Sequence, residues 1–147
     1  MVISKPLTEA GKEDIRSWAY EGRYAVYNLP QDYTFSSGLF YELHLDAERI
    51  GYVHFREEVE TIMLGMGLRP DLCGKGLGTE VLKAVFRISE SVYPEKPLSL
   101  AVRSWNQRAV RCYQKAGFFP RGEEFEMNTP GGRDRFINMI TKERGRE

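Results

Sequence analysis

The segment from Arg69 to Thr79 holds the residues most able to do chemistry. It reads RPDLCGKGLGT and runs from the end of a predicted strand into a predicted helix. Such a turn presents several backbone N–H groups and the positive end of a helix dipole to an anion. The segment therefore predicts a phosphate site, with a tight turn that binds no ligand as the alternative.

Two common phosphate-binding motifs do not fit this segment. A Walker A sequence needs Gly at position 69 and Ser or Thr at position 76, where Arg69 and Gly76 stand. The GxGxxG pattern of dinucleotide-binding folds needs Gly at position 79 or 81, where Thr79 and Val81 stand. A nucleoside triphosphate or a nicotinamide cofactor is therefore disfavoured.

A second segment, from Ser104 to Phe118, reads SWNQRAVRCYQKAGF. With the apolar strand at 62–68 and the GKGLG loop, it resembles the GNAT superfamily of acyl-CoA-dependent N-acetyltransferases, whose signature here is Asn-x-x-Ala-x-x-x-Tyr-x-x-x-Gly-Phe. The resemblance covers about 43–119. One position departs from it, because the family's pyrophosphate motif begins with Arg or Gln where this chain has Cys73.

The resemblance implies acetyl-CoA as the acyl donor, with its pantetheine arm beside the strand at 62–68. Its pyrophosphate would lie on the backbone amides of one loop, which comprises Cys73, Gly74, Lys75, Gly76, Leu77, Gly78 and Thr79. Lys75 could supply a positive charge there. Asn106 matches a position that contacts the pantetheine or an ordered water, and a simple helix N-cap is the alternative.

The resemblance also implies direct attack of a primary amine through a tetrahedral intermediate. Leu68 matches the residue whose backbone N–H polarises the thioester carbonyl, and Tyr113 matches the one whose hydroxyl protonates the leaving thiolate. From spacing alone, Tyr113 could instead be a core tyrosine. Glu60 is the first candidate for the base and Glu58 the second, with a solvated surface glutamate as the alternative for both.

The acceptor site is implied between the N-terminal region and a hairpin at 125–136. Aromatic residues gather before the first strand, namely Trp18, Tyr20, Tyr24, Tyr27, Tyr33 and Phe35, and they either line a pocket or pack the first helix. The run at 133–135 could clamp the substrate or form a solvated turn. The acceptor is predicted to be a small-molecule or peptide amine.

Metal and thiol chemistry are not expected. His44 and His54 have no cluster of Cys, Asp or Glu to complete a metal site. Cys73 at a helix N-terminus could be a nucleophile, but no histidine lies near it in sequence and direct attack by an amine needs no acyl-cysteine. Cys73 and Cys112 are both predicted to be free thiols.

The helices that must position these residues follow from apolar spacing and capping. Thr8 caps a first helix that ends at Gly22, and an apolar stripe predicts a helix over 76–90. Asn106 caps a last helix that Gly117 ends.

The strands follow from apolar runs and alternation. They are predicted at 39–45 and 50–55 as an antiparallel hairpin, at 60–68, at 98–102, and at 118–127 and 136–141 as a closing hairpin. Gly65 and Gly67 predict a bulge or a close approach to the strand at 60–68. Strand-helix-strand order predicts parallel pairing across the helix at 76–90. The fold class is α+β, a GNAT-like mixed sheet of about six to seven strands flanked by helices, in one domain over 1–147.

Composition excludes several functions. The 147 residues carry 21 basic and 21 acidic side chains, so no global basic footprint for nucleic acid or anionic membrane exists. No apolar run is long enough to span a bilayer and no leader is evident, which predicts a cytoplasmic location. A homodimer through the closing hairpin is consistent with the family. A non-catalytic acyl-CoA-binding or regulatory domain is the alternative to an enzyme.

Overall fold

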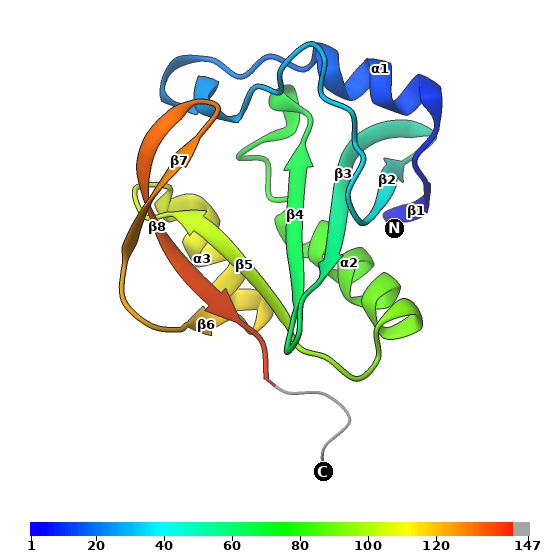
Figure 1. Cartoon of the computed structure of the whole chain (residues 1–147). Coiled ribbons are helices and arrows are strands. Elements are labelled where there is room, and N and C mark those ends of the chain that lie inside the picture. Colours follow the sequence, from blue (N-terminus) through cyan, green and yellow to red (C-terminus); the bar gives the residue numbers. More distant parts are fainter. Residues whose placement is uncertain (143–147) are drawn as a thin grey trace.

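Eight strands form one mixed sheet in the order β1-β2-β3-β4-β5-β8-β6, with β7 paired to β8 (Figure 1). The structure is a computed structural model that describes residues 1–142. Its strands are β1 (Ile3–Pro6), β2 (Leu39–Leu45), β3 (Glu48–Glu57), β4 (Ile62–Leu68), β5 (Leu98–Arg103), β6 (Phe119–Pro120), β7 (Phe125–Thr129) and β8 (Gly132–Ile140). Its helices are α1 (Glu9–Ser17), α2 (Gly78–Val92) and α3 (Gln107–Ala116), with 3₁₀ turns η1 (Gly22–Tyr27) and η2 (Pro70–Leu72). The α+β class and the mixed sheet are confirmed.

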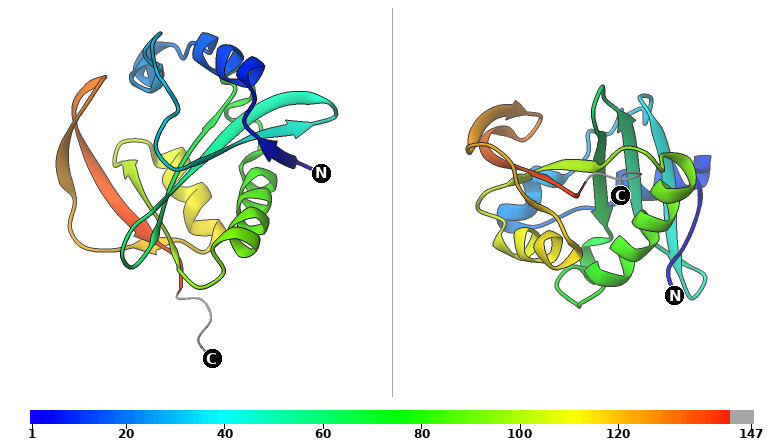
Figure 2. Two further views of the ribbon diagram at one scale, coloured as in Figure 1. Left: turned by 45° about the vertical axis from the view of Figure 1, so that its right-hand side comes forward. Right: turned by 90° about the horizontal axis from the view of Figure 1, so that it is seen from below.

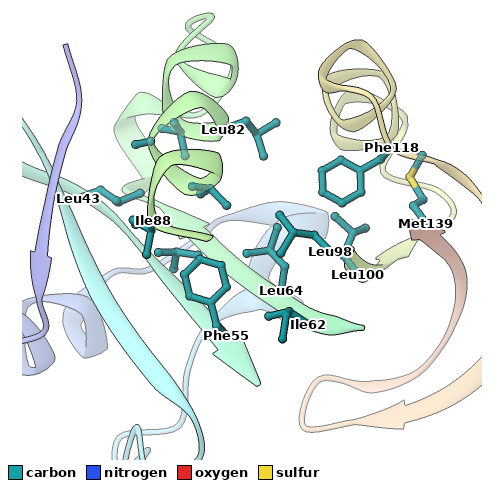
Figure 3. Packing of buried hydrophobic residues seen from close by; sticks show 14 of the residues in the cluster. Leu43, Phe55, Ile62, Leu64, Leu82, Ile88, Leu98, Leu100, Phe118 and Met139 are labelled. Atoms are coloured by element: carbon teal, nitrogen blue, oxygen red, sulfur yellow. The ribbon is translucent and has the colours of Figure 1, made fainter. Parts of the chain in front are cut away.

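Alternation along β3 separates the two faces of the sheet. Val53 and Phe55 belong to the main core, whereas Tyr52, directly before Val53, packs against a second cluster around α1. The buried stripe of α2 lies in the main core, and α2 and α3 lie together on that side of the sheet (Figures 2 and 3). Helices on one face and the N-terminal region on the other therefore hold the sheet between them.

Several boundaries differ from the expectations. The first helix ends at Ser17, because Trp18 is extended and its side chain is buried in the cluster around α1. The strand expected over 118–127 is two strands, β6 and β7, which both pair with β8. β1 and η1 were not expected, since four exposed residues and a run of aromatics give no periodic signal.

The glycines of β4 do not form a bulge. Its register with β3 is continuous from Ile62 to Leu68. The ring of Tyr52 instead lies so close to Gly67 that a side chain there would collide with it. Of the two expectations for these glycines, close approach is the one the structure shows.

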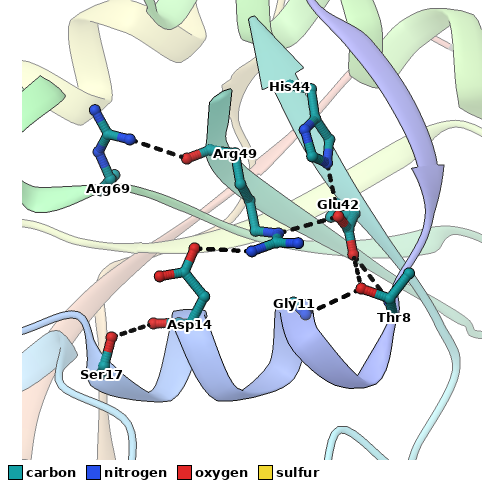
Figure 4. Close-up of polar contacts among 8 residues, drawn as sticks. All are labelled: Thr8, Gly11, Asp14, Ser17, Glu42, His44, Arg49 and Arg69. Atoms are coloured by element: carbon teal, nitrogen blue, oxygen red, sulfur yellow. Dashed lines mark hydrogen bonds and ion pairs between the residues drawn. The ribbon is translucent and has the colours of Figure 1, made fainter. Parts of the chain in front are cut away.

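A buried carboxylate ties α1 to the sheet (Figure 4). Glu42 is fully buried and accepts hydrogen bonds from the backbone and hydroxyl of Thr8, from His44 Nε2 (2.6 Å) and from Arg49 Nε (3.0 Å). Arg49 also binds Asp14 of α1, and its carbonyl accepts a bond of 3.2 Å from Arg69. This network therefore reaches the residue that directly follows β4.

Candidate active site

A cavity opens where β4 and β5 separate. The two strands pair in parallel, as predicted, but only through Ile62 with Leu98 and Met63 with Ser99. Beyond those pairs a cavity of about 1040 Å³ lies between them, and it is lined by the ends of both strands, the glycine loop, α3 and η1. The predicted site residues that line it are Leu68, Cys73, Gly74, Gly76, Leu77, Gly78, Thr79, Asn106 and Tyr113.

The end of β4 offers unpaired backbone to this cavity. Arg69 N–H donates to Ile50 O on β3 (2.7 Å), and bonds in an antiparallel ladder alternate from residue to residue. Leu68 and Met66 therefore direct their backbone groups away from β3, to the side on which Ile62 N–H reaches Pro97 O (2.9 Å). Since β5 has diverged at this point, the Leu68 N–H faces the cavity.

The Leu68 carbonyl is held from the N-terminal region. Tyr20 Oη donates to it over 2.6 Å. Burial raises the pKa of Tyr20 well above its usual value, with smaller contributions from Tyr52 and Cys73, so its hydroxyl keeps the proton that it donates. Tyr20 was expected only as one of a group of aromatics, and nothing in its spacing singled it out.

The glycine loop has the geometry of an anion site. Gly74 and Gly76 have φ of +77° and +80°, in the left-handed region that favours glycine. Gly78 opens α2, and a β-carbon there would collide with the Sγ of Cys112. The N–H groups of the first helical turn have no acceptors within the helix, and Gly78 and Thr79 of this turn line the cavity.

Three cations of α3 line the same cavity. Arg108, Arg111 and Lys115 lie at spacings of three and four residues and so share one face of the helix. Arg108 Nη1 lies 2.9 Å from where a β-carbon of Gly74 would stand. This periodic spacing is visible in the sequence and could have indicated a basic face on the helix. Lys75, the cation expected at the loop, is not among the lining residues.

Tyr113 enters the cavity from α3 with its ring against Phe118, at 5.6 Å between centroids. Within residues 1–142 its hydroxyl has no hydrogen-bond partner. Burial, followed by smaller effects of Cys112, Tyr27 and Tyr52, raises its pKa far above the ordinary range. The hydroxyl is therefore a protonated and unengaged donor at the cavity wall.

Asn106 is the N-cap of α3. Its Oδ1 accepts from Ala109 N–H (3.3 Å), and its Nδ2 donates to Tyr27 Oη (3.0 Å). The capping role is confirmed, and the side chain also lines the cavity. Asn106 thereby connects α3 to η1.

The two candidate bases lie outside the cavity. Glu58 and Glu60 occupy the turn before β4, at the opposite end of that strand from Leu68, and Glu58 pairs with Arg56. At about 3.3 Å per residue, the strand separates Glu60 from Leu68 by roughly 25 Å. The carboxylates that line the cavity are Glu21 and Asp71.

These two lining carboxylates differ in their surroundings. Asp71 pairs with Arg69 over 2.7 Å, and this hydrogen bond lowers the pKa of Asp71. Within the described part of the chain, Glu21 has no ion-pair partner. Glu21 was not singled out from the sequence, where it is one acid among many.

The N-terminal aromatics divide into two groups. Trp18, Tyr33 and Phe35 pack the cluster around α1, whereas Tyr20, Tyr24 and Tyr27 line the cavity. Each alternative is therefore correct for part of the set. Figure 1 shows η1 beside the tip of the β7–β8 hairpin, where Gly131 lies against Val26.

The run at 133–135 is also divided. Arg133 and Arg135 are exposed and pair with Glu126 and Glu124 of their own hairpin segment. Asp134 instead accepts from Trp105 Nε1 (2.8 Å) and Arg103 Nε (3.0 Å). Of these three side chains, only that of Asp134 contacts a residue that lines the cavity, which is Arg103.

The two histidines contact other side chains, and both thiols are free. His54 stacks on Phe40, and His44 binds Glu42. In residues 1–142, no group of three or more His, Cys, Asp or Glu could hold a metal ion. Cys73 and Cys112 are free, as predicted, and burial raises the pKa of both thiols.

Comparison with known proteins identifies the protein family. The model of the acetyltransferase (GNAT) family matches residues 10–118, well over half of the chain. The chain therefore belongs to this family, and the expectation of an N-acetyltransferase is confirmed at that level. Comparison with curated proteins finds no match.

Solved structures with the same fold are distant in sequence. A chimera of spermidine N-acetyltransferase SpeG from Vibrio cholerae and hSSAT is 16% identical, with a TM-score of 0.78 and coverage of 95% of this chain and 94% of that one. The ribosomal-protein-S18-alanine N-acetyltransferase of Escherichia coli is 18% identical, with a TM-score of 0.67 and coverage of 100% and 97%.

The aminoglycoside acetyltransferase AAC(6')-Ib, solved with ribostamycin and coenzyme A, is 24% identical, with a TM-score of 0.72 and coverage of 96% and 93%. At these identities the likeness shows the fold alone. No helix in residues 1–142 is long and apolar enough to cross a membrane.

Proposed function

We propose that this protein transfers an acetyl group from acetyl-CoA to a primary amine by direct attack, without a covalent enzyme intermediate. One observation carries the proposal: the cavity joins an anion-binding loop to a strand end with open backbone groups. A long donor with a diphosphate at one end and amides along its arm is complementary to this arrangement. A solved relative by fold, AAC(6')-Ib, holds acetyl-CoA.

The donor would extend from the loop along β4. The first-turn N–H groups of α2 and the glycine loop would bind the pyrophosphate, and Arg108, Arg111 and Lys115 would neutralise its charge. The pantetheine amides would bind the backbone of Met66 and Leu68 as an added strand does. The Cys73 N–H donates to Pro70 O (3.3 Å), so the N–H groups of the cradle would come from the residues at 74–79, which the departure from Arg or Gln leaves in place.

The chemistry would take place near Leu68. The amine nitrogen forms a bond to the thioester carbon, and the Leu68 N–H stabilises the negative charge that develops on the oxygen. The C–S bond then breaks, and the Tyr113 hydroxyl donates a proton or a hydrogen bond to the thiolate. The attacking nitrogen loses its second proton as the amide forms, and this proton passes through water to the Tyr113 oxygen and restores the hydroxyl.

The acceptor ammonium must lose a proton before it attacks. Because Glu60 lies outside the cavity, we place this role on Glu21, the lining carboxylate without an ion-pair partner. Tyr20, next in sequence, contacts Leu68, so the backbone at Glu21 lies on the same side of the cavity as Leu68. The acceptor itself would be a small-molecule or peptide amine that enters between η1 and the β7–β8 hairpin.

The remaining expectations stay proposals. The sheet contains strands from Ile3 to Ile140, which supports one acetyltransferase domain over 1–147. A cytoplasmic location and a homodimer rest on the sequence alone.

The test is release of the coenzyme A thiol from acetyl-CoA in the presence of a panel of primary amines. We expect turnover with at least one amine that the Tyr113→Phe variant loses. Binding of acetyl-CoA without turnover on any amine would instead favour the non-catalytic acyl-CoA-binding domain.

A further inference from the structure

An almost fully buried arginine lines the cavity at the end of β5. Arg103 exposes only 7% of its surface. Its guanidinium carbon lies 4.7 Å from the centroid of the Tyr27 ring and 5.1 Å from that of Phe136. Because rings cover the guanidinium, its hydrogen bonds must be made at its edge.

Two residues of the β7–β8 hairpin hold one edge of this guanidinium. Arg103 Nε donates to Asp134 Oδ2 (3.0 Å), and Nη2 donates to Thr129 Oγ1 (3.0 Å). Asp134 is fixed in turn by Trp105 Nε1. The orientation of Arg103 is therefore set before any ligand arrives.

The third nitrogen of Arg103 is open. Within residues 1–142, Arg103 Nη1 has no hydrogen-bond partner. It is not fully enclosed, because the only fully enclosed side-chain polar atom without a partner in that part of the chain is Trp18 Nε1. Buried polar groups are nearly always satisfied. A fixed donor that is open at a cavity wall is therefore suited to an oxygen of a ligand.

Arg103 faces the acceptor side of the cavity rather than the loop. It stacks on Tyr27, which packs against Tyr20, and Tyr20 reaches Leu68. The other cations that line the cavity, Arg108, Arg111 and Lys115, all come from α3. Of the acids that line the cavity, Asp71 is paired with Arg69, and Glu21 is exposed at its rim.

We propose that the acceptor is an amine that also carries a carboxylate or a similar oxyanion, and that Arg103 Nη1 binds this group. The inference rests on the proposed function. A charge-assisted bond from a preorganised guanidinium selects an oxyanion, while Glu21 and Leu68 receive the amine at the other wall. Arg103 is thus a specificity-determining residue.

The experiment compares matched acceptors with acetyl-CoA as donor. The pairs are β-alanine with propylamine, γ-aminobutyrate with butylamine, and L-phenylalanine with phenethylamine. Aminoethylphosphonate tests whether any oxyanion suffices, and putrescine tests a second cation in its place. Thiol release gives kcat and KM for each, and acetyl-CoA-dependent thermal stabilisation is measured on every variant.

We expect at least one carboxylate-bearing amine to exceed its plain partner by ten-fold or more in kcat/KM, mainly through KM. Arg103→Lys keeps a positive charge but lacks Nη1, so this ratio should fall toward one while acetyl-CoA still stabilises the protein. Arg133→Lys, on the exposed side of the same hairpin, should leave the ratio unchanged.

Equal or better use of propylamine, butylamine or putrescine would overturn the inference, as would turnover confined to amines without an oxyanion. Failure of every carboxylate-bearing amine would do the same. If acetyl-CoA still stabilises the protein in that case, the donor site stands and only the acceptor class is wrong. If acetyl-CoA does not stabilise it, the proposed function itself has failed.

Discussion

Two tyrosines with raised pKa values lie at the proposed reaction site, on different elements. Tyr20 donates to the Leu68 carbonyl from the N-terminal region, and Tyr113 presents an unengaged hydroxyl from α3. In both, burial is the main cause of the raised pKa. The first hydroxyl is suited to position the strand end, and the second is suited to act on the leaving group.

Removing the Tyr113 hydroxyl should affect chemistry rather than donor binding. In Tyr113→Phe, we expect kcat to fall by roughly 100-fold, the scale of general acid catalysis. Acetyl-CoA-dependent stabilisation should persist. Steady-state thiol release measures the effect, with Tyr93→Phe, outside the cavity, as the matched control. An unchanged kcat would remove Tyr113 from the mechanism.

Removing the Tyr20 hydroxyl should destabilise the protein, since the carbonyl of half-buried Leu68 loses its hydroxyl donor. We expect the free energy of unfolding to fall by about 1–2 kcal/mol in Tyr20→Phe. Denaturant titration measures it. The Tyr33 hydroxyl makes no hydrogen bond within residues 1–142, so Tyr33→Phe is the control. Equal losses in the two variants would argue against a special contact at Tyr20.

The two candidate bases can be separated by paired variants. Glu21→Gln should lower kcat/KM by at least about ten-fold, since it removes the lining carboxylate that could take the proton. Glu60→Gln, outside the cavity, should leave activity as it is. A loss confined to Glu60→Gln would restore the assignment made from the sequence.

Elements whose apolar residues recur at a regular spacing were predictable from the sequence. Elements that are placed by contacts with distant residues were not. The stripe from Val81 to Ile88 predicted α2, and Asn106 and Gly117 marked the ends of α3 correctly. η1 has no apolar period, because its tyrosines are placed by contacts with Trp105 and Asn106 that lie about 80 residues away. No local pattern could have shown those contacts.

The glycine loop and α3 line the cavity, as the sequence argument expects of a binding site, whereas Glu60 does not line it. Glu60 was chosen because it precedes Leu68 along one strand, but a seven-residue strand places its two ends far apart. The acid that reaches the cavity, Glu21, comes from a segment whose path depends on tertiary packing. Closeness in sequence along an extended strand therefore does not bring Glu60 near Leu68.

The junction of α2 and α3 depends on Gly78. In Gly78→Ala, the new methyl group would collide with the Sγ of Cys112, whose single side-chain torsion gives little room. We expect a loss of about 1–3 kcal/mol in unfolding free energy and weaker acetyl-CoA binding. Adding Cys112→Ala should recover most of both. Without that recovery, the steric explanation is wrong.

The molecule as a whole is held by two cores on the faces of the sheet and by the carboxylate of Glu42 between α1 and β2. Burial alone would raise the pKa of Glu42, but hydrogen bonds from Thr8, His44 and Arg49 outweigh it and lower the pKa to about 2. A carboxylate whose folded pKa is depressed stabilises the fold while it is ionised. Protonation of Glu42 in acid therefore destabilises the folded protein.

The stabilisation by Glu42 is fully present above its ordinary pKa of 4.5 and is lost as the pH falls toward about 2. The contribution is roughly 3 kcal/mol. Glu42→Gln should be less stable than the parent near neutral pH, and the gap should narrow across this acid range. Denaturant titrations at several pH values measure it, and a constant gap would contradict the account.

The central claim is that the cavity between β4 and β5 binds acetyl-CoA. Thermal unfolding with and without acetyl-CoA, with NADH and ATP as controls, tests it most directly. At about 100 times its dissociation constant a ligand adds about 2.7 kcal/mol, a shift of several degrees for a domain of this size. Stabilisation by acetyl-CoA but not by the controls is the predicted result, and no shift in a folded sample would contradict the account.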